Sequence, residues 1–267
     1  MRLFSERSGF AAGAIIVAST VLYAGILFHA MRESLAVGTQ VGGQAVLMVL
    51  AIALRSSAAA HITILAFVTA VWLWSGAWPA SWPFALLVPL LVYGVVAGAV
   101  LPLRGTITWL RRGRWDRSIL ALTLLTVVLS ALGLWIWSIN AEPDLSRFGR
   151  ALPTTSVVYL VPIGLGFAVL NAAVEESIFR GIVLQALDSA FGRGWLSLAI
   201  HAMAFGLVHF RGVPDGWIGV AMAAAYGLML GMVRRRSGGL LAPIVAHICA
   251  DLVIFGILVV WIGQGVA

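Results

Sequence analysis

Charged residues are scarce in this chain of 267 amino acids, and lysine is missing altogether. Only 10% of the residues are charged, whereas 61% are hydrophobic. An ordinary soluble domain is about 45–50% apolar and about 25% charged, and it needs polar residues to cover its core. This composition excludes a soluble globular enzyme and a disordered chain. It predicts an all-α protein, a bundle of helices that crosses a membrane several times.

Cysteine and acidic residues are also few. The single cysteine, Cys249, cannot form an intramolecular disulfide, which excludes a disulfide scaffold. The 10 acidic residues stand against 17 arginines and leave a net charge of +7. A basic excess can indicate nucleic-acid binding, but these arginines stand in short groups between apolar runs, which is typical of loops that orient a membrane protein. We therefore expect a lipid bilayer as partner and no nucleic acid.

Apolar runs of about 20 residues predict the membrane spans. Seven runs are clear and two are weaker, because residues 36–54 contain glycine, threonine and glutamine and residues 195–210 are short and carry two histidines. The bundle is therefore predicted to have eight or nine spans. Residues 182–194 have an apolar and a polar side and predict a short helix on the membrane surface. The clear runs are residues 9–30, 60–78, 83–103, 118–139, 157–180, 216–233 and 240–263.

The arginines predict the orientation of the bundle. With nine spans and the N-terminus in the cytoplasm, thirteen arginines fall on the cytoplasmic side and four outside, as the positive-inside rule requires. The short loops favour a prokaryote, so we expect an integral protein of a prokaryotic plasma membrane. The cytoplasmic group is Arg2, Arg7, Arg55, the five arginines of residues 104–117, Arg180, Arg193 and Arg234 to Arg236; the outer group is Arg32, Arg147, Arg150 and Arg211.

Ionisable residues inside apolar runs are a second signal, because they are costly in a membrane and usually serve a function. Glu176 and Arg180 are spaced to pair on one helix face, which leaves Glu175 on another face and free for chemistry. His247 and Asp251 have the same spacing and project together. The alternatives are a charge cluster at a helix end and structural histidines. The ionisable residues within the C-terminal runs are Glu175, Glu176, His201, His209, His247 and Asp251.

Three motifs follow one another in this region: EExxxR at 175–180, FxxxH at 205–209 and HxxxD at 247–251. Their order resembles the CPBP family, also called Abi or type II CAAX prenyl proteases, which are intramembrane endopeptidases. The resemblance covers about residues 150–263 and implies a catalytic membrane core there, preceded by transmembrane helices of unassigned role in residues 1–140. It implies catalytic roles for Glu175, His209, His247 and Asp251, and supporting roles for Glu176, Arg180 and Phe205.

Asp251 departs from the commonest pattern of the family, which has asparagine at this position. Asparagine can donate a hydrogen bond to an oxyanion, whereas an ionised aspartate cannot. Asp251 must therefore be protonated, orient His247 or bind a metal.

The residues and the resemblance together favour hydrolysis of a peptide bond in a membrane-associated peptide or protein. In the preferred scheme Glu175 is the general base that activates water. His209 holds that water and shuttles its proton, while His247 and Asp251 stabilise the oxyanion. This scheme requires no cofactor.

A second scheme has Zn²⁺ held by Glu175, His209 and His247, although the HExxH spacing that makes such a site readable is missing. The alternative function is a proteolytically silent scaffold or a bacteriocin-immunity protein of the same family. A transporter is disfavoured because no internal repeat is evident.

The predicted spans contain one conflict. Glu175 lies near the cytoplasmic end of residues 157–180, whereas His209 lies near the opposite end of residues 195–210. The two side chains can meet only if the second segment is tilted or partly re-entrant, or if the predicted boundaries are wrong.

The orientation can be tested with reporter fusions. We expect a cytoplasmic N-terminus, a cytoplasmic loop at residues 104–117 and a C-terminus on the outside, because this arrangement places most arginines inside. Fluorescent-protein fusions, which report the cytoplasm, and alkaline phosphatase fusions, which report the outside, would assign each position. Both termini on one side would rule out nine spans and leave eight.

Overall fold

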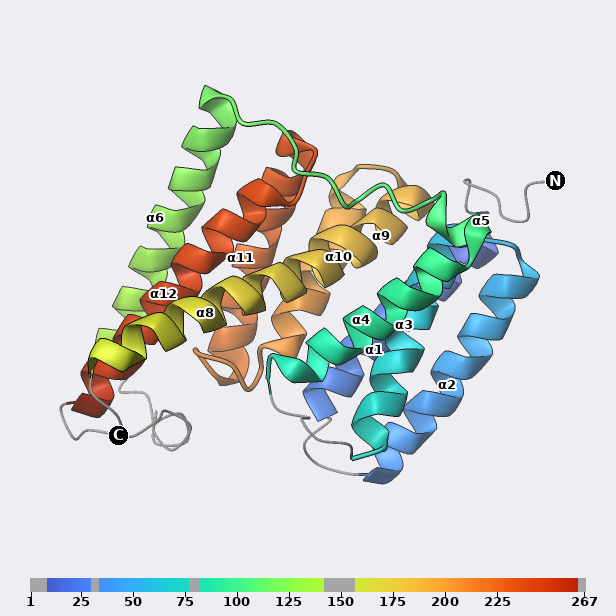
Figure 1. Ribbon diagram of the computed structural model, residues 1–267, viewed down its shortest axis with the longest axis horizontal. Coiled ribbons are helices and arrows are strands. Elements are labelled where there is room, and N and C mark those ends of the chain that lie inside the picture. The colour runs from blue at the N-terminus through green and yellow to red at the C-terminus, as the bar shows by residue number, and fades with distance from the viewer. Residues whose placement is uncertain (1–8, 30–33, 77–81, 142–156, 264–267) are drawn as a thin grey trace.

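The computed structural model describes residues 9–29, 34–76, 82–141 and 157–263, and within these ranges every regular element is a helix. This confirms the predicted all-α class (Figure 1). The helices are α1 (Phe10–His29), α2 (Ser34–Ala53), α3 (Ser57–Trp74), α4 (Phe84–Ala99), α5 (Leu101–Arg104), α6 (Arg117–Asn140), α8 (Val157–Glu176), the π-helix η1 (Ser177–Val183), α9 (Leu184–Phe191), α10 (Trp195–Val208), α11 (Gly216–Ser237) and α12 (Leu241–Gly263).

Nine apolar helical segments correspond to the nine predicted spans. Among the described residues, six are long and apolar enough to cross a membrane, and three are shorter: residues 38–53, 84–99 and 195–208. Two of these three are the segments that the sequence marks as weaker. The chain is therefore an integral membrane protein, and the eight or nine complete crossings stay a prediction.

Helices α6 and α8 have large apolar faces that no other described part of the chain covers. Leu124, Val128 and Trp135 of α6 are more than half exposed, as are Val158 and Tyr159 of α8. Such faces are unusual on a soluble monomer. They suit contact with lipid tails, because a helix hydrophobic on all sides needs an apolar environment.

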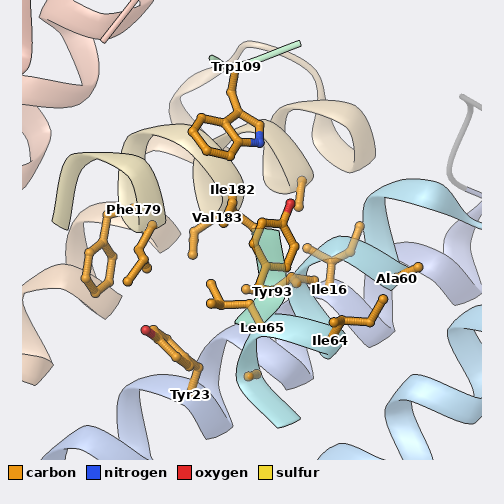
Figure 2. Close-up of a cluster of buried hydrophobic side chains, with 14 of the residues drawn as sticks. Ile16, Tyr23, Ala60, Ile64, Leu65, Tyr93, Trp109, Phe179, Ile182 and Val183 are labelled. Carbon is orange, nitrogen blue, oxygen red and sulfur yellow. The ribbon is translucent and has the colours of Figure 1, made fainter. Parts of the chain in front are cut away.

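The main core joins the N-terminal helices to the middle of the C-terminal half. Figure 2 shows Tyr23 of α1 and Leu65 of α3 beside Phe179 of η1, while Trp109 reaches down over Ile182. The Tyr23 and Phe179 rings lie 6.2 Å apart. Residues 1–140 thus include a wall that packs against the helix carrying the EExxxR motif.

The predicted boundary at residue 180 is wrong. Helix α8 continues through η1 into α9 without a break, from residue 157 to residue 191. Residues 182–194 do not form a separate surface helix, because Leu187 is buried in the main core and Leu184 is buried as well, so neither faces lipid. The apolar side of α9 that suggested a membrane surface is the side that packs against α1 and α3.

Three arginine-bearing segments that are predicted to be cytoplasmic lie at the same end of the bundle. The extended segment 105–116 crosses this end and bonds to the α11–α12 turn, where the Leu240 amide donates to the Arg111 carbonyl. Arg193, in the α9–α10 turn, donates to the Arg235 carbonyl. Arg2, Arg7, Arg32, Arg147 and Arg150, together with the predicted domain boundary, lie outside the described residues.

Helices α10 and α11 approach each other very closely at Gly206. A Cβ atom on this glycine would stand 2.6 Å from the backbone oxygen of Val220 and 2.8 Å from the Ala224 Cβ. Gly227 and Gly231 complete the contact from α11, where they face Phe205 and His201. This GxxxG pair therefore serves packing inside the chain.

Gly206→Ala is expected to lower the free energy of unfolding by about 1–3 kcal/mol, because the added methyl group overpacks a rigid backbone contact. Gly166→Ala in α8 is the matched control. Its Cβ would have no neighbour within 4 Å, and alanine is the better helix former. Thermal unfolding of both variants in detergent checks this, and equal melting temperatures would contradict the close α10–α11 packing.

Candidate active site

Helices α9 and α10 form a helical hairpin. This hairpin brings Glu175, which precedes α9, and His209, which follows α10, to the same level along the bundle. The turn begins at Gly192, whose φ of +73° is rarely adopted by residues with a side chain. Glu175 and His209 each lie 17 residues from Gly192 along the chain. The two arms are thus equal in residue number, and Glu175 and His209 lie 3.7 Å apart across them.

The predicted conflict is resolved by these lengths. Helix α10 has 14 residues, or about 21 Å, which is shorter than the hydrocarbon core of about 30 Å. Its C-terminal end therefore stops within the bundle. Glu175 lies in the middle of the continuous helix 157–191 instead of at an end. No re-entrant loop is needed.

The predicted site residues converge on Glu175. Its Oε2 atom lies 3.7 Å from His209 Nε2 and 3.8 Å from His247 Nε2. The His247 Nε2 atom lies 3.6 Å from Asp251 Oδ1. These distances exceed direct hydrogen bonds, and Glu175 Oε2 has no hydrogen-bond partner among the described residues. The four groups thus face one another at distances that a shared small molecule can bridge.

Glu176 accepts a hydrogen bond from the other ring nitrogen of His247, Nδ1. Its Oε1 atom lies 2.6 Å from His247 Nδ1 and 2.9 Å from Arg180 Nη1. The predicted pair with Arg180 is confirmed, and the bond to His247 is a further finding. Arg180 and Glu176 are both buried, and the guanidinium carbon lies 4.0 Å from the centre of the Phe205 ring. With Nδ1 donating to Glu176, His247 presents Nε2 to Glu175.

His209 is oriented by the backbone of its own helix. Its Nδ1 atom lies 2.7 Å from the Phe205 carbonyl oxygen, so Nδ1–H donates and Nε2 faces Glu175. The Phe205 ring lies 4.4 Å from the His209 ring and 6.2 Å from the His247 ring. Phe205 therefore contacts both histidines, and its supporting role stays a prediction.

Asn171 joins the site although sequence reasoning missed it. Its amide nitrogen donates to Asp251 Oδ2 at 3.0 Å, and its oxygen accepts from Trp82 Nε1 at 2.6 Å. Its spacing could have identified it, because Asn171 precedes Glu175 by four residues and lies on the same helix face. Trp82 precedes α4, so the N-terminal part of the chain contributes to this polar network.

A cavity of about 200 Å³ opens beside the histidines, between α6, α10, α11 and α12. His209, His247 and Asp251 line it together with apolar side chains such as Leu129 and Met222. Tyr226 also lines it, with its ring 5.7 Å from His247 and at 90° to it. The buried Tyr226 hydroxyl has no hydrogen-bond partner among the described residues. Tyr226 is a second residue that sequence reasoning missed.

The π-helix η1 follows the two glutamates directly. Wide π turns inside α-helices are rare and frequently occur at functional sites. Here η1 carries Phe179 into the main core and Arg180 toward Glu176. Trp109 lies against Gly181, where a Cβ would stand 2.7 Å from the indole ring.

Residues 157–253 match the family model described as type II CAAX prenyl endopeptidase Rce1-like. These residues form an Rce1-like domain. The resemblance predicted from the motifs is thus confirmed for this part of the chain, which contains every predicted site residue. No curated protein and no solved structure matches the chain in two further comparisons.

The Rce1-like domain supports an intramembrane endopeptidase of the CAAX type at the level of the family. It also supports a bilayer and a peptide substrate as the general partners. The family has inactive members, so the roles of individual residues in the Rce1-like domain stay predictions. His201, the histidine within α10, is buried against Gly231, and neither of its ring nitrogens has a hydrogen-bond partner among the described residues.

The zinc scheme receives no support from the geometry of the Rce1-like domain. Glu175, His209 and His247 face one another, but no group of three or more His, Cys, Asp or Glu residues among those described is arranged to hold a metal ion. Independence from metal stays a prediction, which chelation tests.

Proposed function

We propose that the chain is an intramembrane endopeptidase in which Glu175 activates water. The observation that carries this proposal is the meeting of Glu175, His209 and His247 within 3.8 Å beside a cavity with mostly apolar walls. A carboxylate with one oxygen that lacks a hydrogen-bond partner among the described residues, next to two imidazoles, is a suitable general base. A cavity within an apolar bundle suits a substrate that reaches it from the membrane.

The reaction begins when Glu175 takes one proton from water and the water oxygen attacks the scissile carbonyl carbon. His209 Nε2 binds the same water and aligns it. The C–O bond forms, and the carbonyl becomes a tetrahedral oxyanion. The C–N bond then breaks, and the proton held by Glu175 passes to the leaving nitrogen. The products are a carboxylic acid and an amine.

The oxyanion needs donors in place before it forms. With Nδ1–H donating to Glu176, His247 donates from Nε2 in its imidazolium form, in which both ring nitrogens carry a proton. Tyr226 adds a hydroxyl on the same cavity wall. Asp251, held by Asn171, orients His247 in place of the direct donor that asparagine would supply. Buried donors that face a cavity stabilise charge more strongly than donors in water.

The two adjacent glutamates give a matched pair of variants. Glu175→Gln is expected to abolish proteolysis with little change in melting temperature, because it keeps the shape and removes the base. Glu176→Gln leaves buried Arg180 without its carboxylate, and breaking a buried pair costs about 3–5 kcal/mol. It is expected to lower stability and to reduce activity only in part.

Cleavage is measured with internally quenched peptides that carry an acyl chain or a prenylated C-terminal cysteine, and mass spectrometry identifies the products. Thermal unfolding in detergent gives the stability. Full activity of Glu175→Gln would point to another base. Absence of cleavage by wild type across this panel would favour the silent scaffold or immunity protein.

Asp251→Asn is expected to retain most activity, and 1,10-phenanthroline is expected not to inhibit the purified protein. Asparagine keeps the shape, still accepts a hydrogen bond from Asn171 and adds an N–H donor. If Asp251 supported a zinc ligand, the same change would cost about 10–100-fold in activity. Stoichiometric zinc with reversible inhibition by the chelator would contradict the metal-free reaction.

A further inference from the structure

Arg180 lines a second cavity, which differs from the one beside the histidines. This cavity of about 530 Å³ lies at the arginine-rich end of the bundle, between α3, residues 105–111, α9 and the C-terminal end of α11. Besides His61, its ionisable lining side chains are five arginines and one acid. They are Arg111, Arg180, Arg193, Arg234, Arg235 and Asp188.

The few acidic groups near this cavity are already paired. Asp188 forms a close ion pair with Arg235 and accepts a hydrogen bond from Ser197. Glu176 pairs with Arg180 from the side of the candidate active site. Among the described residues, no carboxylate lies within ion-pair distance of Arg111, Arg193 or Arg234. The cavity therefore has a large uncompensated positive charge.

Buried donors on the cavity wall lack acceptors. Arg180 is only 1% exposed, and its nitrogens make no hydrogen bond to the described residues beyond the ionic contact with Glu176. The Arg234 Nε atom is buried without a partner as well. A buried donor without an acceptor destabilises the folded state. An anion in the cavity would supply the acceptors.

We propose that this cavity binds a phosphate group, either in the headgroup of an anionic phospholipid or as a free phosphate. The guanidinium fork matches two phosphate oxygens at once. A cavity of several hundred cubic ångströms accommodates a headgroup of this size. Its place at the arginine-rich end of the membrane helices is where basic cavities bind anionic lipid headgroups.

Binding is measured as a rise in melting temperature of the full chain in dodecyl maltoside at constant ionic strength, because a ligand that binds only the folded state stabilises it. The probes are sodium phosphate and dihexanoyl phosphatidylglycerol, with sodium chloride and dihexanoyl phosphatidylcholine as controls. We expect a saturable rise with phosphatidylglycerol, with phosphate or with both. Phosphatidylglycerol alone identifies a lipid, and phosphate alone identifies a soluble anion. No saturable rise with either overturns the proposal.

Two double variants remove equal charge from the same two segments. Arg111→Gln with Arg234→Gln changes the cavity wall, whereas Arg112→Gln with Arg236→Gln changes exposed neighbours outside it. The first is expected to raise the half-saturating concentration at least about tenfold, since each lost charged hydrogen bond typically weakens binding by about that factor. The second should leave it nearly unchanged.

Equal losses in the two double variants would show diffuse charge attraction and overturn the proposal. If the first double variant does not fold, Arg111→Gln alone is scored in the same way against Arg112→Gln, since both side chains are exposed.

Discussion

The carboxylate of Glu176 is the constraint on which the C-terminal half depends. One oxygen of this fully buried group meets both Arg180 and His247. A charge at such a depth is tolerated only when it is paired and hydrogen-bonded. Helix α12 must therefore lie where His247 reaches α8, and η1 must turn Arg180 back toward the same oxygen. Because the bond to Glu176 fixes the ring of His247, its Nε2 atom points toward Glu175 and Asp251.

Adjacent carboxylates acquire different chemistry from this arrangement. Residues one apart on a helix point about 100° apart, so Glu176 faces the ion pair while Glu175 faces the histidines. Glu175 is equally buried, yet its Oε2 has no bonded partner among the described residues. The scaffold thus neutralises one acid and leaves its neighbour with an accepting atom beside a cavity. Both residues are glutamates, so their different surroundings come only from the directions in which their side chains point.

Hydropathy and spacing could predict what lies within one helix. The apolar runs located nearly every described helix, and spacing of four residues identified Glu176 with Arg180 and His247 with Asp251. Contacts between helices could not be obtained in this way. The hydrogen bond between His247 and Glu176 joins residues 71 apart. A periodic pattern predicts which face of a helix is apolar, but it does not predict which other helix packs against that face. The amphipathic pattern of α9 suggested a membrane surface for the same reason, because protein core and lipid are equally apolar.

The polar chain from Trp82 through Asn171 to Asp251 holds an aspartate at the position where the resemblance to the family predicts asparagine. The indole donates to the Asn171 oxygen, which leaves the Asn171 amide to donate onward to Asp251. The Asp251 oxygen that receives this bond needs only to accept, which carboxylates and amides both do. The two residue types therefore differ only at the other terminal atom, the one beside His247. Trp82 thereby connects residues outside the Rce1-like domain to Asp251, and gives the N-terminal part of the chain a place in the polar network of the site.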